Sequence, residues 1–208
     1  MDFLMMQNIS ETNKKLSVLL KEIRSCRVCE QFLPLGVNPV LKASSQAKIL
    51  IVGQAPGTKV HQTGIPWNDA SGDKLREWMD VDKETFYDEN QIAIVPIGFC
   101  YPGKGKSGDL PPRKECAPLW HEKILKLLPN LELILLVGLY AQKFYLGKEN
   151  KKTLTGTVKA YKEYWPKFFP LVHPSPRNKF WLMQNPWFED QVVSDLRLEV
   201  HRLLNRNP

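Results

Sequence analysis

An apolar run that stops at a glycine limits the possible folds of this chain more than any other stretch. Residues 48–52 are rich in β-branched and aliphatic side chains and lead into Gly53, a pattern typical of a buried strand in a parallel sheet. The following residues, Gln54-Ala55-Pro56-Gly57, favour a turn and cannot continue the strand. A loop therefore begins at the carboxyl end of a strand, which is where open α/β sheets bind ligands. An ordinary βα loop with polar decoration is the alternative.

The loop after this strand is polar. It carries Gln54, His61, Asn68 and Asp69 before Ser71 caps a new helix. We therefore take these side chains as candidates for contact with a ligand.

Predicted strands alternate with predicted helices along the 208 residues. Strands are expected at 48–52, 91–95, 131–137 and 168–172, and helices at 10–25, 71–79, 115–128, 139–146 and 190–204. This alternation predicts an α/β fold with a parallel sheet covered by helices on both faces. The length suits one domain, residues 1–208, with a sizeable core.

Charge and hydropathy exclude some classes of protein. The formal net charge of +7 favours a polyanionic partner, although proteins that touch no nucleic acid also carry such a surplus. The first ten residues lack a basic segment followed by a long apolar core, and no run reaches the ~20 apolar residues of a membrane helix. We expect a cytoplasmic protein that does not enter a membrane.

Four cysteines are present: Cys26, Cys29, Cys100 and Cys116. The first two form a C-x2-C pair, and the other two bracket a Gly- and Pro-rich loop that spans residues 98–113. A reducing cytoplasm disfavours disulfides, so paired thiols indicate a metal site or redox chemistry. Scattered buried thiols are the alternative interpretation.

Two short motifs carry a resemblance to a known family. Gly53-Gln54-Ala55-Pro56-Gly57 resembles the first motif of the uracil-DNA glycosylase superfamily, and His173-Pro174-Ser175-Pro176 resembles its second, in the family's order. The similarity extends from about Cys26 to the last helix. It implies a three-layer α/β/α fold with a central four-stranded parallel sheet. It also implies a monomeric base-excision-repair glycosylase that hydrolyses the N-glycosidic bond of uracil or another deaminated base in DNA.

The cysteines are similar to those of the iron-sulfur branch of this superfamily. That resemblance implies that all four thiolates hold a 4Fe-4S cluster, although zinc also accepts four thiolates. The implied role is structural, because hydrolytic base removal needs no electron. The cluster would tie the N-terminal segment to the 98–113 loop and hold Lys104, Lys106 and Arg113 near a DNA backbone.

The resemblance also assigns catalytic roles. His173 would donate a hydrogen bond to the oxygen of the departing base, where negative charge gathers, but a histidine before Pro-Ser-Pro could instead only hold a turn. Asp69, two residues before Ser71-Gly72, would position or activate water, but it could instead cap the following helix. Gln54 replaces a glutamate of the iron-sulfur branch, and its amide could still orient water. No lysine is marked as a Schiff-base nucleophile, so we expect a monofunctional enzyme.

Further residues are candidates for contact with the base and with DNA. Trp67 falls where related enzymes place a phenylalanine under the flipped base, with core packing as its alternative. The remaining candidates for base contact are Ala55, Pro56, Gly57, His61 and Asn68. The candidates for DNA contact are Ser175, Arg177, Asn178 and Lys179.

One position departs from the iron-sulfur branch. Four residues before the third cysteine, where that branch reads the base with an asparagine, this chain has Pro96. Proline has no side-chain donor or acceptor. Asn68 or backbone groups could compensate, or the preferred base could differ from uracil. A DNA-binding module that kept the fold but lost base recognition is therefore the second functional hypothesis. A nucleotide-phosphate site is a poorer third, because the loop lacks both glycine-rich phosphate motifs.

Overall fold

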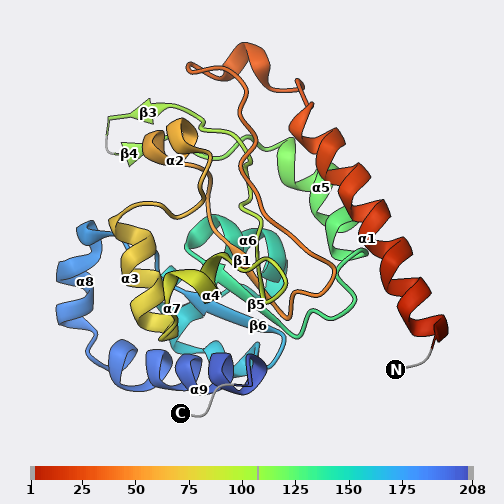
Figure 1. Ribbon diagram of the computed structural model, residues 1–208. Coiled ribbons are helices and arrows are strands. Elements are labelled where there is room, and N and C mark those ends of the chain that lie inside the picture. The colour runs from red at the N-terminus through yellow and green to blue at the C-terminus, as the bar shows by residue number, and fades with distance from the viewer. Residues whose placement is uncertain (1–2, 107, 206–208) are drawn as a thin grey trace.

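The computed structural model describes residues 3–106 and 108–205, and a sheet of four parallel strands lies at its centre (Figure 1). The strands are β1 (Ile49–Val52), β2 (Ile92–Ile94), β5 (Leu133–Val137) and β6 (Phe168–Leu171). They are arranged in the order β2-β1-β5-β6, and each neighbouring pair is parallel. Helices pack on both faces, so the expected three-layer α/β/α architecture is confirmed.

Both faces of the sheet are buried, which explains the continuous apolar run that begins at Ile49. Successive side chains of a strand point to opposite faces. Ile49 and Ile51 therefore pack into one core, whereas Leu50 and Val52 pack into the other. A strand buried on both sides shows no polar alternation in its sequence.

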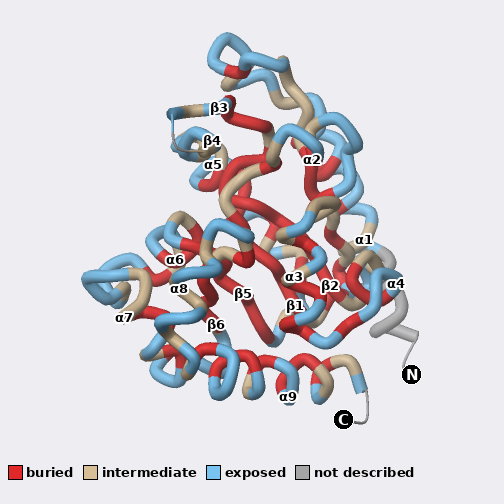
Figure 2. The backbone as a smooth tube through the Cα atoms, turned by 90° about the vertical axis from the view of Figure 1, so that its left-hand side faces the viewer, coloured by how far each residue is buried: buried red, intermediate tan, exposed pale blue. Residues whose placement is uncertain are grey.

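Each core is closed by its own set of helices. One face carries α1 (Phe3–Arg24), α5 (Cys116–Leu125) and α6 (Leu139–Leu146). The other carries α3 (Ala70–Met79), α4 (Lys83–Tyr87), α7 (Leu154–Lys159) and α9 (Ser194–Leu203). Figure 2 shows the strands almost wholly buried, whereas buried and exposed residues alternate along α9. No helix among the described residues is both long and apolar enough to cross a membrane.

The structure adds short elements that the sequence pattern did not predict. Among them are α2 (Thr58–Thr63), α4, α7, α8 (Lys179–Gln184) and a hairpin of β3 (Lys104–Gly105) and β4 (Gly108–Asp109). The last element expected as one helix at 190–204 begins instead as a π-helical segment, Phe188–Val193, which continues into α9. Elements this short hold too few residues to show a hydrophobic period.

The chain changes direction across the sheet at β1. It passes from β1 to β2 on one side and then crosses back to β5 on the other side of β1. Such a switch opens a crevice beyond the carboxyl ends of the strands. Gly53 follows β1 at this crevice, and Gly138 and His173 lie beside each other after β5 and β6.

Candidate active site

A cavity of about 500 Å³ opens at the carboxyl ends of the strands. Most of its lining comes from four parts of the sequence: the loop after β1, the end of β2 with the residues after it, the β3–β4 hairpin and the loop after β6. The lining includes these residues that the sequence singles out: Gln54, Ala55, Pro56, Gly57, Trp67, Asp69, Ser71, Pro96, Lys104, His173, Ser175 and Arg177. The two motifs, which lie more than 100 positions apart, therefore share one site.

Gln54 lies on the wall of this cavity. Its side-chain Nε2 donates a 3.0 Å hydrogen bond to the carbonyl oxygen of Leu110. Its backbone carbonyl oxygen accepts a hydrogen bond from Gly98 N at 2.9 Å. The amide therefore joins the loop after β1 to the end of the β3–β4 hairpin. Because Nε2 donates to a carbonyl, the side-chain oxygen Oε1 remains as the group that can accept a hydrogen bond from water.

Asp69 combines the two roles that the sequence left open. It is the N-cap of α3, with extended backbone and an Oδ1 that accepts from Gly72 N at 2.9 Å. It also lines the cavity. The cap uses only one oxygen, and no described residue donates a hydrogen bond to Oδ2. Capping and contact with a cavity water are therefore compatible.

Trp67 has an unusual backbone conformation. Its φ is 56°, in the left-handed region that bulky residues rarely adopt. Its indole lies against the backbone of Gly53, where a β-carbon would come within 2.9 Å of Cζ2. The other ring contact is with His173, at a centroid distance of 5.5 Å and an interplanar angle of 29°. Trp67 therefore forms an aromatic floor between the end of β1 and His173.

His173 follows β6 and is partly buried beside Trp67. Burial lowers the pKa of the imidazole below its ordinary value, although the nearby Asp69 carboxylate opposes this shift. Its backbone carbonyl accepts from Asn178 Nδ2 at 2.7 Å, which fixes the loop. The ring is therefore neutral at physiological pH and can donate one hydrogen bond from one nitrogen.

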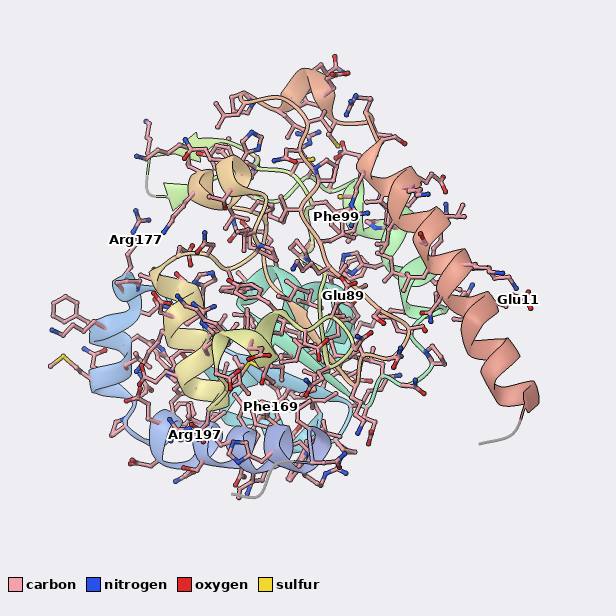
Figure 3. All side chains as sticks on the ribbon, viewed as in Figure 1. Glu11, Glu89, Phe99, Phe169, Arg177 and Arg197 are labelled. Atoms are coloured by element: carbon pink, nitrogen blue, oxygen red, sulfur yellow. The ribbon has the colours of Figure 1, made fainter. Side chains whose placement is uncertain are left out.

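The β3–β4 hairpin forms a wall that the sequence did not predict. It contributes Lys104, Gly108 and Asp109 to the cavity. Burial raises the pKa of Asp109, and the nearby Arg177 and Lys104 lower it in part. Figure 3 shows Arg177 pointing toward this hairpin from the short helical turn 176–178 that precedes α8. Its Nη1 lies 2.8 Å from where a β-carbon of Gly108 would be. A basic side chain thus reaches across the mouth of the cavity.

Four of the predicted contact residues do not line the cavity. His61 lies on α2 with its ring against Tyr101, at a centroid distance of 6.1 Å. Asn68 is partly buried outside the cavity lining. The amide of Asn178 is used within its own loop, and Lys179 borders a separate groove beside α8.

Pro96 lines the cavity, but neither its side chain nor its carbonyl is available to read a base. The carbonyl oxygen accepts a hydrogen bond from Nε2 of the buried His121 at 3.0 Å. Nδ1 of the same ring accepts from the hydroxyl of Tyr145 at 2.8 Å. Burial lowers the pKa of His121 to about 4, so the ring is neutral and this tautomer is fixed. The part of the wall near Pro96 is apolar.

All four cysteines border one small apolar pocket at the other end of the 98–113 loop. Phe99 N donates to Cys116 Sγ at 3.4 Å, and Cys29 Sγ donates to Glu115 at 3.9 Å. Burial raises the pKa of Cys116 to about 12 and also raises those of Cys29 and Cys100. Among the described residues, no three metal-binding side chains are placed to hold one metal ion. The four thiols nevertheless border one pocket, so their convergence agrees with the sequence.

Comparison with known proteins identifies relatives of this chain. The model of the uracil DNA glycosylase superfamily matches residues 41–197. A type-4 uracil-DNA glycosylase of Sulfurisphaera tokodaii is 26% identical over 170 residues, which cover 77% of this chain and 74% of that protein. A solution NMR structure of a provisionally assigned uracil DNA glycosylase from Methanosarcina acetivorans aligns with a TM-score of 0.44 and 16% identity. That alignment covers 77% of this chain and 98% of the other.

Proposed function

The chain belongs to the uracil-DNA glycosylase superfamily, and from this membership and its cavity we propose that it removes a deaminated base from DNA by hydrolysis. The observation that carries the proposal is that Gln54, Asp69 and His173 line one cavity with the Trp67 indole beside them. A flipped base needs an aromatic platform, a donor for its oxygen and a group that handles water. The cavity supplies all three.

His173 is proposed to stabilise the departing base. As the bond between C1′ of the sugar and the base nitrogen breaks, its electron pair passes to the base, and the sugar becomes oxocarbenium-like. A neutral imidazole can donate a hydrogen bond to the base oxygen that gains negative charge. The stacked Trp67 ring restricts how the imidazole can turn, since the two planes lie within 29° of each other.

Asp69 and Gln54 are proposed to handle the water. Oδ2 of Asp69 can accept a hydrogen bond from water while Oδ1 caps α3. Oε1 of Gln54 can accept another, because its amide nitrogen is held by Leu110. The oriented water oxygen then attacks C1′ and its proton passes to the Asp69 carboxylate. That proton finally neutralises the departed base anion, so the products are free base and an abasic site. None of these steps needs a lysine nucleophile, so we propose a monofunctional glycosylase.

We also propose that the four cysteine thiolates hold a 4Fe-4S cluster. Such a cluster takes four cysteine thiolates. The pocket bordered by all four cysteines supplies this donor set. When bound, the cluster would supply structural support rather than a reaction step. It would hold the start of the loop that carries the β3–β4 hairpin.

Excision from defined oligonucleotides tests the proposal. We expect the protein to release a base from at least one of three duplexes that contain uracil, hypoxanthine or xanthine, and to leave an alkali-labile abasic site. We propose that it acts as a cytoplasmic monomer. Analytical ultracentrifugation of the same preparation would check the monomeric state. Loss of DNA binding between low and moderate salt is expected as counterions compete with the basic residues. Absence of release from all three duplexes would overturn the enzymatic proposal.

The position of Pro96 favours the second candidate, a DNA-binding module of the same fold. Its apolar contact surface and its engaged carbonyl provide no polar group for reading a base. Such a module would bind DNA with the same salt dependence but release no base. The oligonucleotide panel therefore separates the two functions directly.

A further inference from the structure

Arg76 is a buried cation on α3, behind the cavity, with 6% of its surface exposed. Its guanidinium lies over the rings of Phe86 and Tyr87, at 5.0 and 5.7 Å from their centroids. Nη2 donates to Asp73 at 2.6 Å. A buried charge is costly unless it is paired and hydrogen-bonded, so the position of this group is narrowly defined.

The other terminal nitrogen of this cation is directed at the backbone of the cavity floor. Nη1 of Arg76 donates to the carbonyl oxygen of Trp67 at 3.4 Å and to the hydroxyl of Tyr87 at 3.4 Å. The hydroxyl of Tyr87 donates in turn to the Trp67 carbonyl oxygen at 3.3 Å. Two side chains therefore hold the carbonyl of the residue whose φ is 56°.

Glycine is required around the same peptide. A β-carbon at Gly72 would collide with the Trp67 carbonyl oxygen, and one at Gly53 would press on the indole. The surroundings thus accommodate Trp67 in one backbone conformation and one ring position. A left-handed conformation of a bulky residue persists only where the surrounding structure enforces it.

We propose that Arg76 is a positioning residue for base excision, which fixes the Trp67 carbonyl from behind and so holds the indole against His173. Arg76 itself does not line the cavity. Its effect would pass through Trp67 to the platform under the base and to the imidazole beside it. The part of this inference that concerns catalysis rests on the proposed glycosylase function, whereas the part that concerns the orientation of Trp67 does not.

Fluorescence of Trp67 tests the orientation directly. For each variant, the contribution of Trp67 is the emission spectrum of that variant minus the spectrum of the same variant carrying Trp67→Phe. We expect Arg76→Met to shift this emission to the red and to increase its quenching by acrylamide, and Arg76→Lys to restore part of the wild-type signal. Gly72→Ala displaces the same carbonyl and should change the signal in the same way. If Arg76→Met perturbs folding, Tyr87→Phe removes only the second donor and should give a smaller shift.

Kinetics test the consequence for excision. We expect Arg76→Met to lower the single-turnover rate roughly tenfold to a hundredfold, the scale of a small misplacement in an active site, with DNA affinity unchanged. Arg197→Met is the matched control, because Arg197 also donates to a backbone carbonyl of α3, that of Glu77 at 3.0 Å, but far from the cavity. It should leave both signals at the wild-type value.

Two results would overturn the inference. One is a folded Arg76→Met protein with wild-type Trp67 emission. The other is altered emission with a wild-type excision rate. A wild-type protein that releases no base would instead contradict the proposed function, and the emission would still decide whether Arg76 orients Trp67.

Discussion

The side-chain amide of Gln54 donates a 3.0 Å hydrogen bond to the carbonyl oxygen of Leu110. This bond joins the loop after β1 to the hairpin that lies between Cys100 and Cys116. It also accounts for glutamine at a position where the resembling iron-sulfur branch has glutamate. A carboxylate cannot donate to a carbonyl.

The first prediction follows from this bond. Gln54→Glu should weaken the attachment of the hairpin, because two acceptor oxygens would then face each other. We expect faster amide hydrogen exchange at residues 104–106 and 108–110 and a lower single-turnover rate. Gln62→Glu, at an exposed position of α2, is the control for the added charge. A Gln54→Glu protein with unchanged exchange and higher excision would contradict this reading of the contact.

Asp69→Asn separates capping from contact with water. Asparagine caps a helix about as well as aspartate, so thermal stability should stay within the range of an ordinary surface substitution. Excision should nevertheless fall on the order of a hundredfold, the scale of losing one preorganised group. The single-turnover rate and the melting temperature are measured on the same sample of the variant and compared with those of the wild type. Full activity in the variant would show that Asp69 only caps α3 and has no role with the water.

Two histidines with lowered pKa values, His121 and His173, predict a loss of stability in acid. Burial lowers the pKa of both His173 and His121, the latter to about 4. Between the ordinary value of about 6.5 and these lowered values, the unfolded chain binds protons that the folded chain does not, so stability falls as the pH falls. Urea midpoints at pH 7.5 and pH 5 measure the loss, and His173→Gln should reduce it. Equal losses in the wild type and this variant would show that His173 does not contribute.

Much of this site follows from sequence because of parallel strands. Gly53 and His173 each follow a buried strand, and the carboxyl ends of parallel strands meet at one edge of the sheet. Their convergence was therefore predictable without knowing the strand order. The burial of both faces of β1 also follows from the sequence, because residues 49–52 are apolar without interruption.

Other parts depend on tertiary contacts that leave no local signal. Asp109 enters the cavity on a strand of two residues, which is too short to show a period, and its place depends on the bond between Gln54 and Leu110. His61 lies on a six-residue helix whose rotation directs its ring toward Tyr101 rather than into the cavity. The left-handed conformation of Trp67 depends on Arg76, which donates to its carbonyl oxygen. It also depends on glycine at position 72, where a β-carbon would collide with that oxygen.

Removal of one thiol tests the cluster and its structural role together. Cys100→Ser should abolish the brown colour and the iron content of anaerobic preparations, because serine is a poor substitute for a thiolate ligand. Hydrogen exchange at residues 104–106 and 108–110 should then increase, because the hairpin lies in the loop that the cluster would hold. A colourless wild-type protein that contains no metal and folds normally would show that the four cysteines are only packed thiols.

The last prediction concerns the apolar wall at Pro96, where this chain departs from the resembling enzymes. Pro96→Asn places a side-chain amide at the cavity while its backbone carbonyl can still accept from His121. An amide can donate to one uracil oxygen and accept from the neighbouring N–H, which no side-chain group at this position now does. We therefore expect Pro96→Asn to raise the rate of uracil excision above that of the wild type, measured under single-turnover conditions. Pro96→Leu is the control, since it frees the backbone N–H but adds no side-chain polar group. If the wild type already removes uracil efficiently and Pro96→Asn changes nothing, the base is read by other groups of the cavity, and the proline does not limit the substrate range.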